Sequence, residues 1–371
     1  MKRIPNMKQY LTSRWMGALA LSLAIAAALP AQAASLSIVT VASTVPSNGD
    51  VNPYGVAVVP ASIGKLVEGH ILVSNFNNSA NEQGTGTTIV DIAPNGAVTL
   101  FAWIDPSTLP GQCPGGVGLT TALVVLRAGW VIVGSLPTTD GTSATAQAGC
   151  LIVLDHAGAV TETISGNFIN GPWDMTALDM DATADLFVTN VLNGTVAGNG
   201  SVVQEGSVVR LVLTALKTSA PALASVTTIG SGFPERTDPA ALVIGPTGLG
   251  LGADGTLYVA DSLSNRIAAI DTAATRTSSA GIGITVTTST TLNDPLGLAV
   301  RPTNGDILTV NGNNGLLVET TAAGGQVAQG LLDASGTPPG SGALFGLAPT
   351  PQGLYYVDDA TNTLRLLTST P

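Results

Sequence analysis

The sequence predicts an all-β chain that folds as a six-bladed β-propeller with four-stranded blades. Only 10% of the 371 residues are charged and 45% are hydrophobic, which excludes a disordered chain and long solvated helices. Gly (44) and Pro (22) are frequent, as in β proteins with many turns. A short apolar phrase ending in Asn, Asp or Ser also recurs six times, and such repeats are the sequence signature of a propeller.

The first 33 residues have the features of an export signal. A basic start is followed by an apolar run, Trp15 to Leu29, and by the small-residue site Ala31-Gln32-Ala33. This run is shorter than the roughly 20 residues of a membrane-spanning helix, although an uncleaved anchor is the alternative. We therefore expect an exported protein, periplasmic or extracellular, with no membrane span after cleavage. Residues 34–371 are expected to form one propeller domain.

The repeated phrase has the pattern of a buried strand. Leu257-Tyr-Val-Ala-Asp261 and Leu354-Tyr-Tyr-Val-Asp358 lie 97 residues apart and match at Leu, Tyr and Asp. The same phrase appears at 71–75, 186–190 and 307–311, and in a weaker form at 131–135, at intervals that fit one unit of four strands. The six copies end at Asn75, Ser135, Asn190, Asp261, Asn311 and Asp358.

Each copy lies between other short apolar runs. An earlier run, such as Gly297-Leu-Ala-Val300, precedes it across a turn like Pro302-Thr-Asn-Gly-Asp306. A third run, such as Thr88-Ile-Val-Asp-Ile92, follows it, and a fourth often comes after a Gly turn. We call these strands a, b, c and d, counted outward from the axis. Six such units predict six blades, and the weak second copy leaves five or seven blades as alternatives.

The two ends of the chain complement each other. The sixth unit ends at Leu364-Arg-Leu-Leu367, after three strands, and Leu36 to Val41 forms a spare strand before the first unit. Pairing the two strands would close the ring and remove two open sheet edges. We predict that the mature N-terminal strand completes the last blade.

The segment from Leu257 to Ile267 resembles the core of an NHL repeat, and Asp294-Pro-Leu-Gly-Leu-Ala299 strengthens the likeness. The resemblance implies a six-bladed propeller distantly similar to the gluconolactonase/senescence-marker superfamily. Metal-dependent members of that group hold a divalent cation at the axis with Glu, Asn and Asp. Asp261 falls at the position of the Asp ligand, and Asn190 or Asn75 would supply the amide. Asn52-Pro53-Tyr54-Gly55 stands where the Glu is expected.

The residues that end the b strands should share one end of the propeller. One interpretation is a ring of oxygen ligands for a substrate or for a divalent cation such as calcium, which prefers carboxylate and amide oxygens. The other is that these side chains cap the b–c turns, and the repeated turn residues Asn265 and Asn362 favour it. The predicted binding residues are Asn75, Trp173, Asp174, Asn190, Asp261, Asn311 and Asp358, with Asp261 and Asn190 as the candidate metal ligands.

The sequence contains no motif for a catalytic nucleophile. There is no G-x-S-x-G phrase, and the formal net charge of -11 excludes a phosphate-binding, nucleic-acid surface. The favoured function is therefore a binding or scaffolding module, expected to be a monomer. A metal-dependent hydrolase or lyase of the lactonase type is the alternative, and a structural envelope protein is a third possibility.

The only two cysteines, Cys113 and Cys150, are predicted to form a disulfide. Export places them in an oxidising compartment. They precede strand a and begin strand c of the second unit. Alternate strands of a blade run in the same direction, so both cysteines should lie at the same end of one blade. Two separate thiols are the alternative.

The b–c loops differ in length around the ring. They are long in the first three units, at residues 77–86, 137–149 and 193–206, and tight in the last three. Long loops are usually functional or disordered. We predict that a small-molecule or protein partner binds on this face, over the first three units, with disorder of the loops as the alternative.

Overall fold

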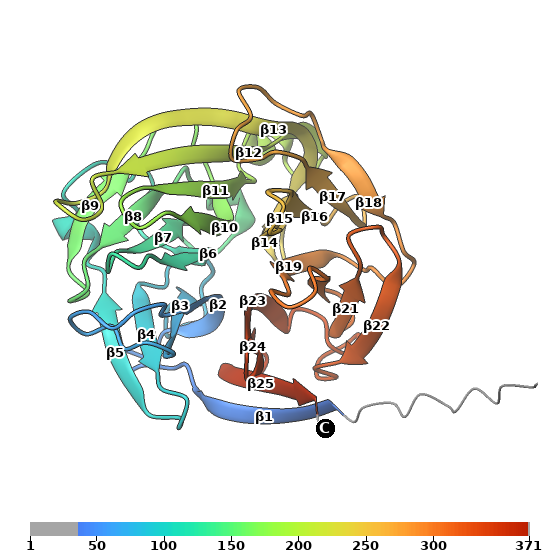
Figure 1. Ribbon diagram of the computed structural model, residues 1–371, viewed down its shortest axis with the longest axis horizontal. Helices are drawn as coiled ribbons and strands as arrows, with labels where there is room; N and C mark the ends of the chain where they lie inside the picture. Colours follow the sequence, from blue (N-terminus) through green and yellow to red (C-terminus); the bar gives the residue numbers. More distant parts are fainter. Residues whose placement is uncertain (1–35, 370–371) are drawn as a thin grey trace, which may run out of the picture. The chain divides into compact units, whose positions relative to one another are not determined.

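The computed structural model describes residues 36–369, so the predicted signal segment 1–33 lies outside the described residues. Residues 36–369 form 25 strands in six antiparallel sheets that surround a central axis (Figure 1). This confirms the predicted six-bladed β-propeller. In this part of the chain no helix is long and apolar enough to cross a membrane.

Each sheet is one blade, numbered I to VI in chain order from β2, and its strands follow one another outward from the axis. Blade I contains β2 (Val51–Val58), β3 (Ile71–Asn77), β4 (Thr88–Ile92) and β5 (Val98–Trp103). Blade II contains β6 (Leu119–Val125), β7 (Val131–Ser135), β8 (Cys150–Leu154) and β9 (Val160–Ile164). Blade III contains β10 (Pro172–Asp179), β11 (Ala184–Asn190), β12 (Val203–Thr214) and β13 (Ala222–Asp238), followed by the short β14 (Leu242–Ile244). Blade IV contains β15 (Pro246–Leu251), β16 (Leu257–Asp261), β17 (Arg266–Ile270) and β18 (Ile284–Thr287). Blade V contains β19 (Pro295–Val300), β20 (Ile307–Asn311), β21 (Leu316–Thr320) and β22 (Gln326–Leu331). Blade VI contains β23 (Leu344–Thr350), β24 (Gly353–Asp358), β25 (Thr363–Ser369) and β1 (Leu36–Ser43).

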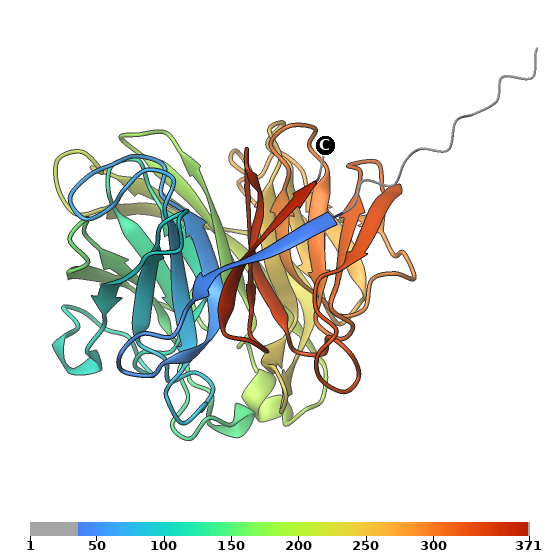
Figure 2. The same cartoon turned by 90° about the horizontal axis from the view of Figure 1, so that it is seen from below.

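The ring closes as predicted from the sequence. β1 pairs antiparallel with β25 and forms the outer strand of blade VI. Figure 2 shows β1 running along the outside of this last blade. The outer edge of β25 is thereby covered by the N-terminal strand, which joins the two ends of the described chain.

Small residues let the inner strands approach one another. A Cβ atom at Gly297 would lie 1.8 Å from the carbonyl oxygen of Phe345 in the next blade, and one at Gly346 would lie 2.3 Å from that of Tyr54. Only glycine fits at such contacts. Blades II and III carry Thr121 and Asp174 at the equivalent position of strand a.

Blade III departs from the regular pattern. Its outer strand β13 continues past the blade and pairs with the short β14 to make a hairpin in the connection to blade IV. Leu242 in this hairpin is 2% exposed and has a φ of 64°, a left-handed conformation that bulky residues rarely adopt. The sequence analysis did not predict this element.

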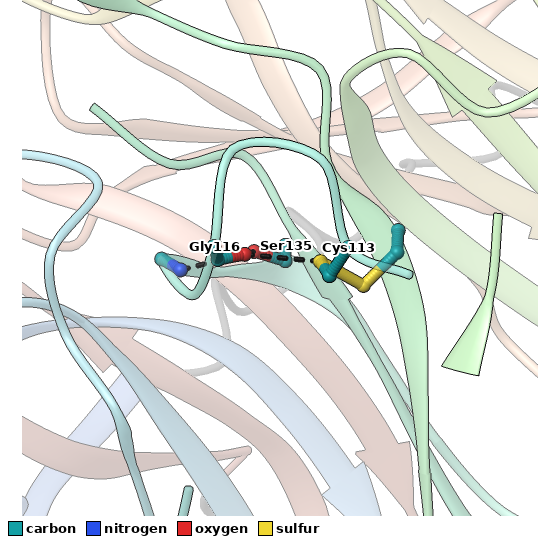
Figure 3. The surroundings of a disulfide bond; sticks show 5 residues. Cys113, Gly116 and Ser135 are labelled. Atoms are coloured by element: carbon teal, nitrogen blue, oxygen red, sulfur yellow. Dashed lines mark hydrogen bonds between the residues drawn. A yellow bond between two sulfur atoms is a disulfide. The ribbon is translucent and has the colours of Figure 1, made fainter. Parts of the chain in front are cut away.

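The predicted disulfide joins Cys113 and Cys150 (Figure 3). Cys113 lies in the segment before β6, and Cys150 begins β8, so the bond connects two segments at the same end of blade II, as expected. The Ser135 hydroxyl donates to the carbonyl oxygen of Gly116 at 2.9 Å and accepts from the amide of Gly118 at 3.0 Å. The last residue of β7 therefore holds the same segment that the disulfide anchors.

Candidate functional site

Four of the five predicted ring residues end a b strand, the other lies two residues before the end of β3, and all five are fully buried. Each has an exposed fraction of 0%, and none of them lines a cavity found in residues 36–369. The five are Asn75, Asn190, Asp261, Asn311 and Asp358.

The two aspartates of this ring bind arginines of their own blades. Arg266 on β17 donates through Nε to Asp261 Oδ2 at 2.7 Å. Arg266 also donates to Thr285 Oγ1 at 3.0 Å and to the carbonyl oxygen of Ile282 at 2.7 Å. In blade VI, Arg365 Nη1 lies 3.1 Å from Asp358 Oδ2. These carboxylates therefore hold strands c and d to strand b.

The three asparagines of the ring tie down the chain that enters their blades. The Asn75 amide donates to the carbonyl oxygen of Thr44 at 3.0 Å, and the Asn311 amide donates to that of Thr291 at 2.7 Å. Asn190 donates to the carbonyl oxygen of Phe168 and accepts from the amide of Asn170, both at 3.1 Å. The second interpretation expected caps of the b–c turns, whereas none of these contacts caps such a turn; each joins strand b to the segment that leads into strand a of the same blade.

The residues suggested by the resemblance do not fit a divalent cation. The Asp261 carboxylate already has the Arg266 guanidinium as its counter-ion, and both polar atoms of the Asn190 amide are bound to backbone. Within residues 36–369, no three His, Cys, Asp or Glu side chains lie close enough together to hold a metal ion. A cation site needs several free oxygens that converge, and this donor set does not supply them.

Asp174 and Trp173 lie near the axis, where Asp174 lines a cavity and Trp173 packs in a buried hydrophobic cluster. Asp174 lines an axial cavity of about 390 Å³ whose wall is built from the six inner strands. Its carboxylate accepts from the amides of Met175 at 2.8 Å and Leu249 at 2.9 Å. Burial raises the pKa of Asp174 to about 7, against these hydrogen bonds, which lower it. Asp174 thus links blades III and IV at the axis.

An aromatic cluster closes the axial cavity on the side of the b–c loops. Tyr54 stacks between Phe76 and Phe345, with ring centroids 4.5 and 3.9 Å apart. Trp173 lies 6.4 Å from Phe345 and is 5% exposed. Leu242 of the β13–β14 hairpin packs in the same buried cluster. Trp173 is thereby packed into the core, and its predicted role in ligand stacking stays a prediction.

A second, larger cavity of about 620 Å³ lies on the other side of this aromatic cluster. We call it the rim pocket. Blades IV to VI supply most of its wall, and the β13–β14 hairpin and the start of β2 complete it. Its polar lining residues are Asn52, Arg236, Asp238, Ser262, Asn265, Asn293, Asp294, Asn313, Ser341 and Asp359.

Strand register explains which residues reach the rim pocket. Side chains alternate along a strand, so the residue after each predicted ring position points the other way. In blades IV to VI these residues are Ser262, Gly312 and Asp359, and all three line the rim pocket. In blades I to III they are Phe76, Leu136 and Val191, and all three belong to the core cluster around the aromatic residues.

Two equivalent hydrogen bonds place Asn52 and Asp294 in the wall. Asn362 Oδ1 accepts from the amide of Asn52, and Asn265 Oδ1 accepts from the amide of Asp294, both at 2.7 Å. The two acceptors sit 97 residues apart in tight b–c turns. Asn52 and Asp294 have φ values of 61° and 57°, and such left-handed, non-glycine residues often mark functional sites.

Two carboxyl groups in the rim pocket have raised pKa values. Burial raises the pKa of Asp294 to about 6, with a further increase from Asp238 and a decrease from Arg236. Burial also raises the pKa of Asp359 to about 7, and the neighbouring Asp358 adds to the shift. Raised values in a cavity are typical of functional carboxyls.

The long b–c loops of blades I to III form a wall beside the rim pocket. The Thr138 amide donates to the carbonyl oxygen of Gly84 at 3.0 Å, joining the loops of blades I and II. In blade III the Gly200 amide donates to Thr237 Oγ1 at 3.0 Å, which joins that loop to the hairpin. The structure describes these loops throughout, and the pocket opens over the other half of the same face.

The sequence analysis missed Asp294, Asp359 and the polar role of Asn52. One available signal was the phrase Asn52-Pro-Tyr-Gly55, which matches Asp294-Pro-Leu-Gly297 and places a polar residue at the same point of strand a. The hairpin residues Arg236 and Asp238 had no such signal.

Comparisons with known proteins agree on the fold. No model of a known protein family and no curated protein sequence matches this chain. Among solved structures, a gluconolactonase from Xanthomonas campestris is similar with a TM-score of 0.55 and 14% identity, covering 90% of both chains. A calcium-binding regucalcin from Agrobacterium tumefaciens is similar with a TM-score of 0.53 and 14% identity, covering 87% of this chain and 92% of the other.

A luciferin-regenerating enzyme is similar with a TM-score of 0.56 and 13% identity, covering 90% of this chain and 95% of the other. Identities this low show the fold alone. The structural neighbours are therefore gluconolactonase- and regucalcin-type six-bladed propellers, in agreement with the distant resemblance identified in the sequence.

Proposed function

We propose that this chain is an exported, monomeric binding protein whose small-molecule ligand occupies the rim pocket. The observation that carries this proposal is a cavity of about 620 Å³, of the size that small-molecule sites have. Its wall contains polar side chains, such as Asn313 and Ser341, on the b–c face, although the sequence placed the partner over the first three units of that face rather than over the last three. The predicted signal segment and the disulfide support export, because disulfides persist in oxidising compartments.

A pocket-filling substitution tests this proposal. Ala240 lies on the hairpin and lines the rim pocket, so Ala240→Trp should fill part of it. Ala222→Trp is the matched control, because Ala222 is exposed on β13 and lines no cavity among the described residues. In a ligand-observed NMR screen of a fragment library, Ala240→Trp should remove most hits and the control should keep them. Hits that persist in Ala240→Trp would place the site elsewhere.

An enzymatic role is the second candidate, and the raised pKa values of Asp294 and Asp359 favour it. Groups with a pKa near neutrality can act as general acids or bases. The expected activity would be hydrolysis of a lactone or related ester without a metal ion. Acid release from a lactone panel, measured with and without a chelator, tests this. Activity that survives the chelator and is lost in Asp294→Asn would support it.

A further inference from the structure

The rim pocket contains more acidic than basic groups. Its lining residues include three aspartates and one arginine. The arginine is already paired, because Arg236 Nη2 lies 2.8 Å from Asp238 Oδ2 on the same hairpin. Among the described residues that line the pocket, Asp294 and Asp359 are therefore left without a cation of their own.

The Asp294 carboxyl group belongs to a residue that lines the rim pocket, and it has no hydrogen-bond partner among the described residues. No described residue donates a hydrogen bond to it, and its own backbone amide is bound to Asn265. Gly312 makes the space that it occupies, since a Cβ atom there would lie 2.8 Å from Asp294 Oδ2. An ionised carboxylate has about four acceptor positions on two oxygens, and no described residue donates to any of them here.

The Asp359 carboxylate has one partner. With its amide oriented to satisfy both neighbours, Asn52 donates to Asp359 Oδ1 at 2.7 Å and accepts from Asn77 at 3.0 Å. Asp359 lies at the same pocket as Asp294 but comes from blade VI rather than from the start of blade V. Acceptors thus approach the cavity from two sides.

Two aromatic side chains line the rim pocket together with these carboxylates. Tyr54 and Phe345 are 4% and 5% exposed, and both line the rim pocket. The Tyr54 side chain is close enough to Asn52 and Asp359 for both to act on its pKa, which burial raises. Because Tyr54 stacks between Phe76 and Phe345, both of its ring faces are covered, and these side chains supply apolar surface for the rest of the ligand rather than a ring face for its cation.

We infer that the rim pocket recognises a cationic, amine-bearing small molecule, with Asp294 and Asp359 as its counter-ions and Tyr54 and Phe345 as apolar surface for the rest of it. This inference rests on the proposed function and specifies its ligand class. An ammonium group supplies only donors, which matches two carboxylates that accept few or no bonds from the protein. A carboxylate or phosphate ligand would instead meet unpaired negative charge.

Amine binding should also release protons from the protein. The pKa of Asp294 is influenced by Asp238 and Arg236, and that of Asp359 by Asp358. Because burial gives the two carboxyls pKa values of about 6 and 7, part of each population is protonated at neutral pH. A bound cation favours the ionised form, so binding must displace that proton. A neutral ligand has no such requirement.

Three probes of one shape but different charge test the ligand class. Benzylamine, benzyl alcohol and benzoate are titrated into the mature protein, residues 34–371, at pH 7.5, with backbone NMR shifts as the readout. Benzylamine should bind at least tenfold more tightly than benzyl alcohol, and benzoate should not bind. Titration calorimetry in buffers of different ionisation enthalpy should show proton release for benzylamine alone.

Two isosteric variants and one control locate the counter-ions. Asp294→Asn and Asp359→Asn should each weaken benzylamine binding at least tenfold and leave benzyl alcohol unchanged. Asp271→Asn should change neither, because Asp271 is 66% exposed and pairs with Arg276 outside the pocket. Should an isosteric variant fail to fold, Ala240→Trp serves as the pocket-blocking substitute and should abolish benzylamine binding.

The other outcomes separate the inference from the proposed function. If benzyl alcohol binds in the rim pocket as tightly as the amine, the ligand class is wrong and the proposed function stands. If calcium chloride displaces benzylamine at equal concentration, the carboxylates form a metal site and the inference is overturned. If no probe and no fragment shifts a rim-pocket resonance, both proposals fail.

Discussion

At the residue scale, Arg266 shows how a protein can supply its own cation inside a β-propeller. Its guanidinium is 6% exposed, binds the fully buried Asp261 carboxylate at 2.7 Å, and lies 5.8 Å from the centre of the Phe233 ring. Burial alone raises the pKa of Asp261, and Arg266 opposes that shift. The carboxylate is therefore stabilised by a side chain where the family resemblance suggested a metal ion.

We predict that Arg266→Met destabilises the protein by about 3–5 kcal/mol, because it leaves a buried carboxylate without a partner. The double variant Asp261→Leu with Arg266→Met should recover most of this loss, since an apolar pair of similar volume has no charge to desolvate. Urea unfolding measures both. Arg276→Ala, which breaks an exposed pair with Asp271, should cost less than about 1 kcal/mol. A single Arg266→Met variant as stable as wild type would contradict this account.

None of the five predicted ring residues lines the rim pocket, although three of them directly precede a residue that does. In blades II to VI the repeated phrase indicated where strand b ends, whereas β3 continues past Asn75 to Asn77. In blades IV to VI the residue that lines the rim pocket is the one after the phrase, as with Asp359 after Asp358. A fully buried strand has no polar–apolar alternation, so its sequence does not show which parity faces the axis. The equivalent Phe76 in blade I lies in the core and gives no polar signal.

At the element scale, the strands were predictable because each unit repeats the same run of short apolar segments, and the β13–β14 hairpin was not. Ser231-Gly-Phe-Pro-Glu235 has the composition of a turn, but the structure continues β13 through it to Asp238. Glu235 and Thr237 then accept bonds from the blade III loop. These tertiary contacts, which no local pattern encodes, hold the hairpin in place.

Closure of the ring gives a prediction for β1. A protein that begins at Thr44 lacks the strand that pairs with β25, and we expect it to unfold at a lower temperature because β25 becomes an open edge. A synthetic peptide of residues 35–45 should restore the transition in a concentration-dependent way, since a ligand that binds only the folded state stabilises it. A scrambled peptide is the control. A transition unaffected by the truncation would show that closure contributes little.

The wall of long loops gives a second prediction at this scale. The partner surface over blades I to III stays a prediction, and shortening the three b–c loops to four-residue turns tests it. The loops contact one another and the hairpin, so we expect a modest fall in the thermal midpoint and loss of any protein partner found by pull-down. Benzylamine binding should weaken less than tenfold, because Asp294 and Asp359 come from the other blades. A partner retained by the trimmed protein would place the protein-binding face elsewhere.

At the scale of the whole molecule, the ring is asymmetric across its axis. Blades I to III turn apolar residues such as Leu136 and Val191 towards the mouth and cover it with long loops. Blades IV to VI turn Ser262 and Asp359 towards it and leave the rim pocket open. The rim pocket lies on the same face as the long loops but where the loops are short, so the two halves of this face differ in structure.

Several carboxyl groups are buried in the folded protein, and their raised pKa values make the free energy of unfolding depend on pH. Burial raises the pKa of Glu235 to about 8 and that of Asp174 to about 7, so the folded protein holds protons that the unfolded chain releases above about pH 4–5. Stability falls with rising pH wherever the folded state binds more protons, by about 1.4 kcal/mol per pH unit for each such proton. The exposed Asp105 has a lowered pKa and acts in the opposite direction, but only in more acidic solution.

We therefore expect the thermal midpoint to fall steadily from pH 5.5 to pH 8.5, as measured by differential scanning calorimetry. Glu235→Gln isolates one contribution. Glu235 Oε1 accepts from the Asn193 amide at 3.0 Å, whereas Oε2 is buried without a partner among the described residues, so glutamine keeps the first bond and removes the titrating proton. This variant should match wild type at about pH 4, before the unfolded chain releases the Glu235 proton, and should become increasingly more stable than wild type towards pH 8.5. A wild-type midpoint that rises across this range would mean that these carboxyls are ionised in the folded state, paired with cations that the protein acquires from solution.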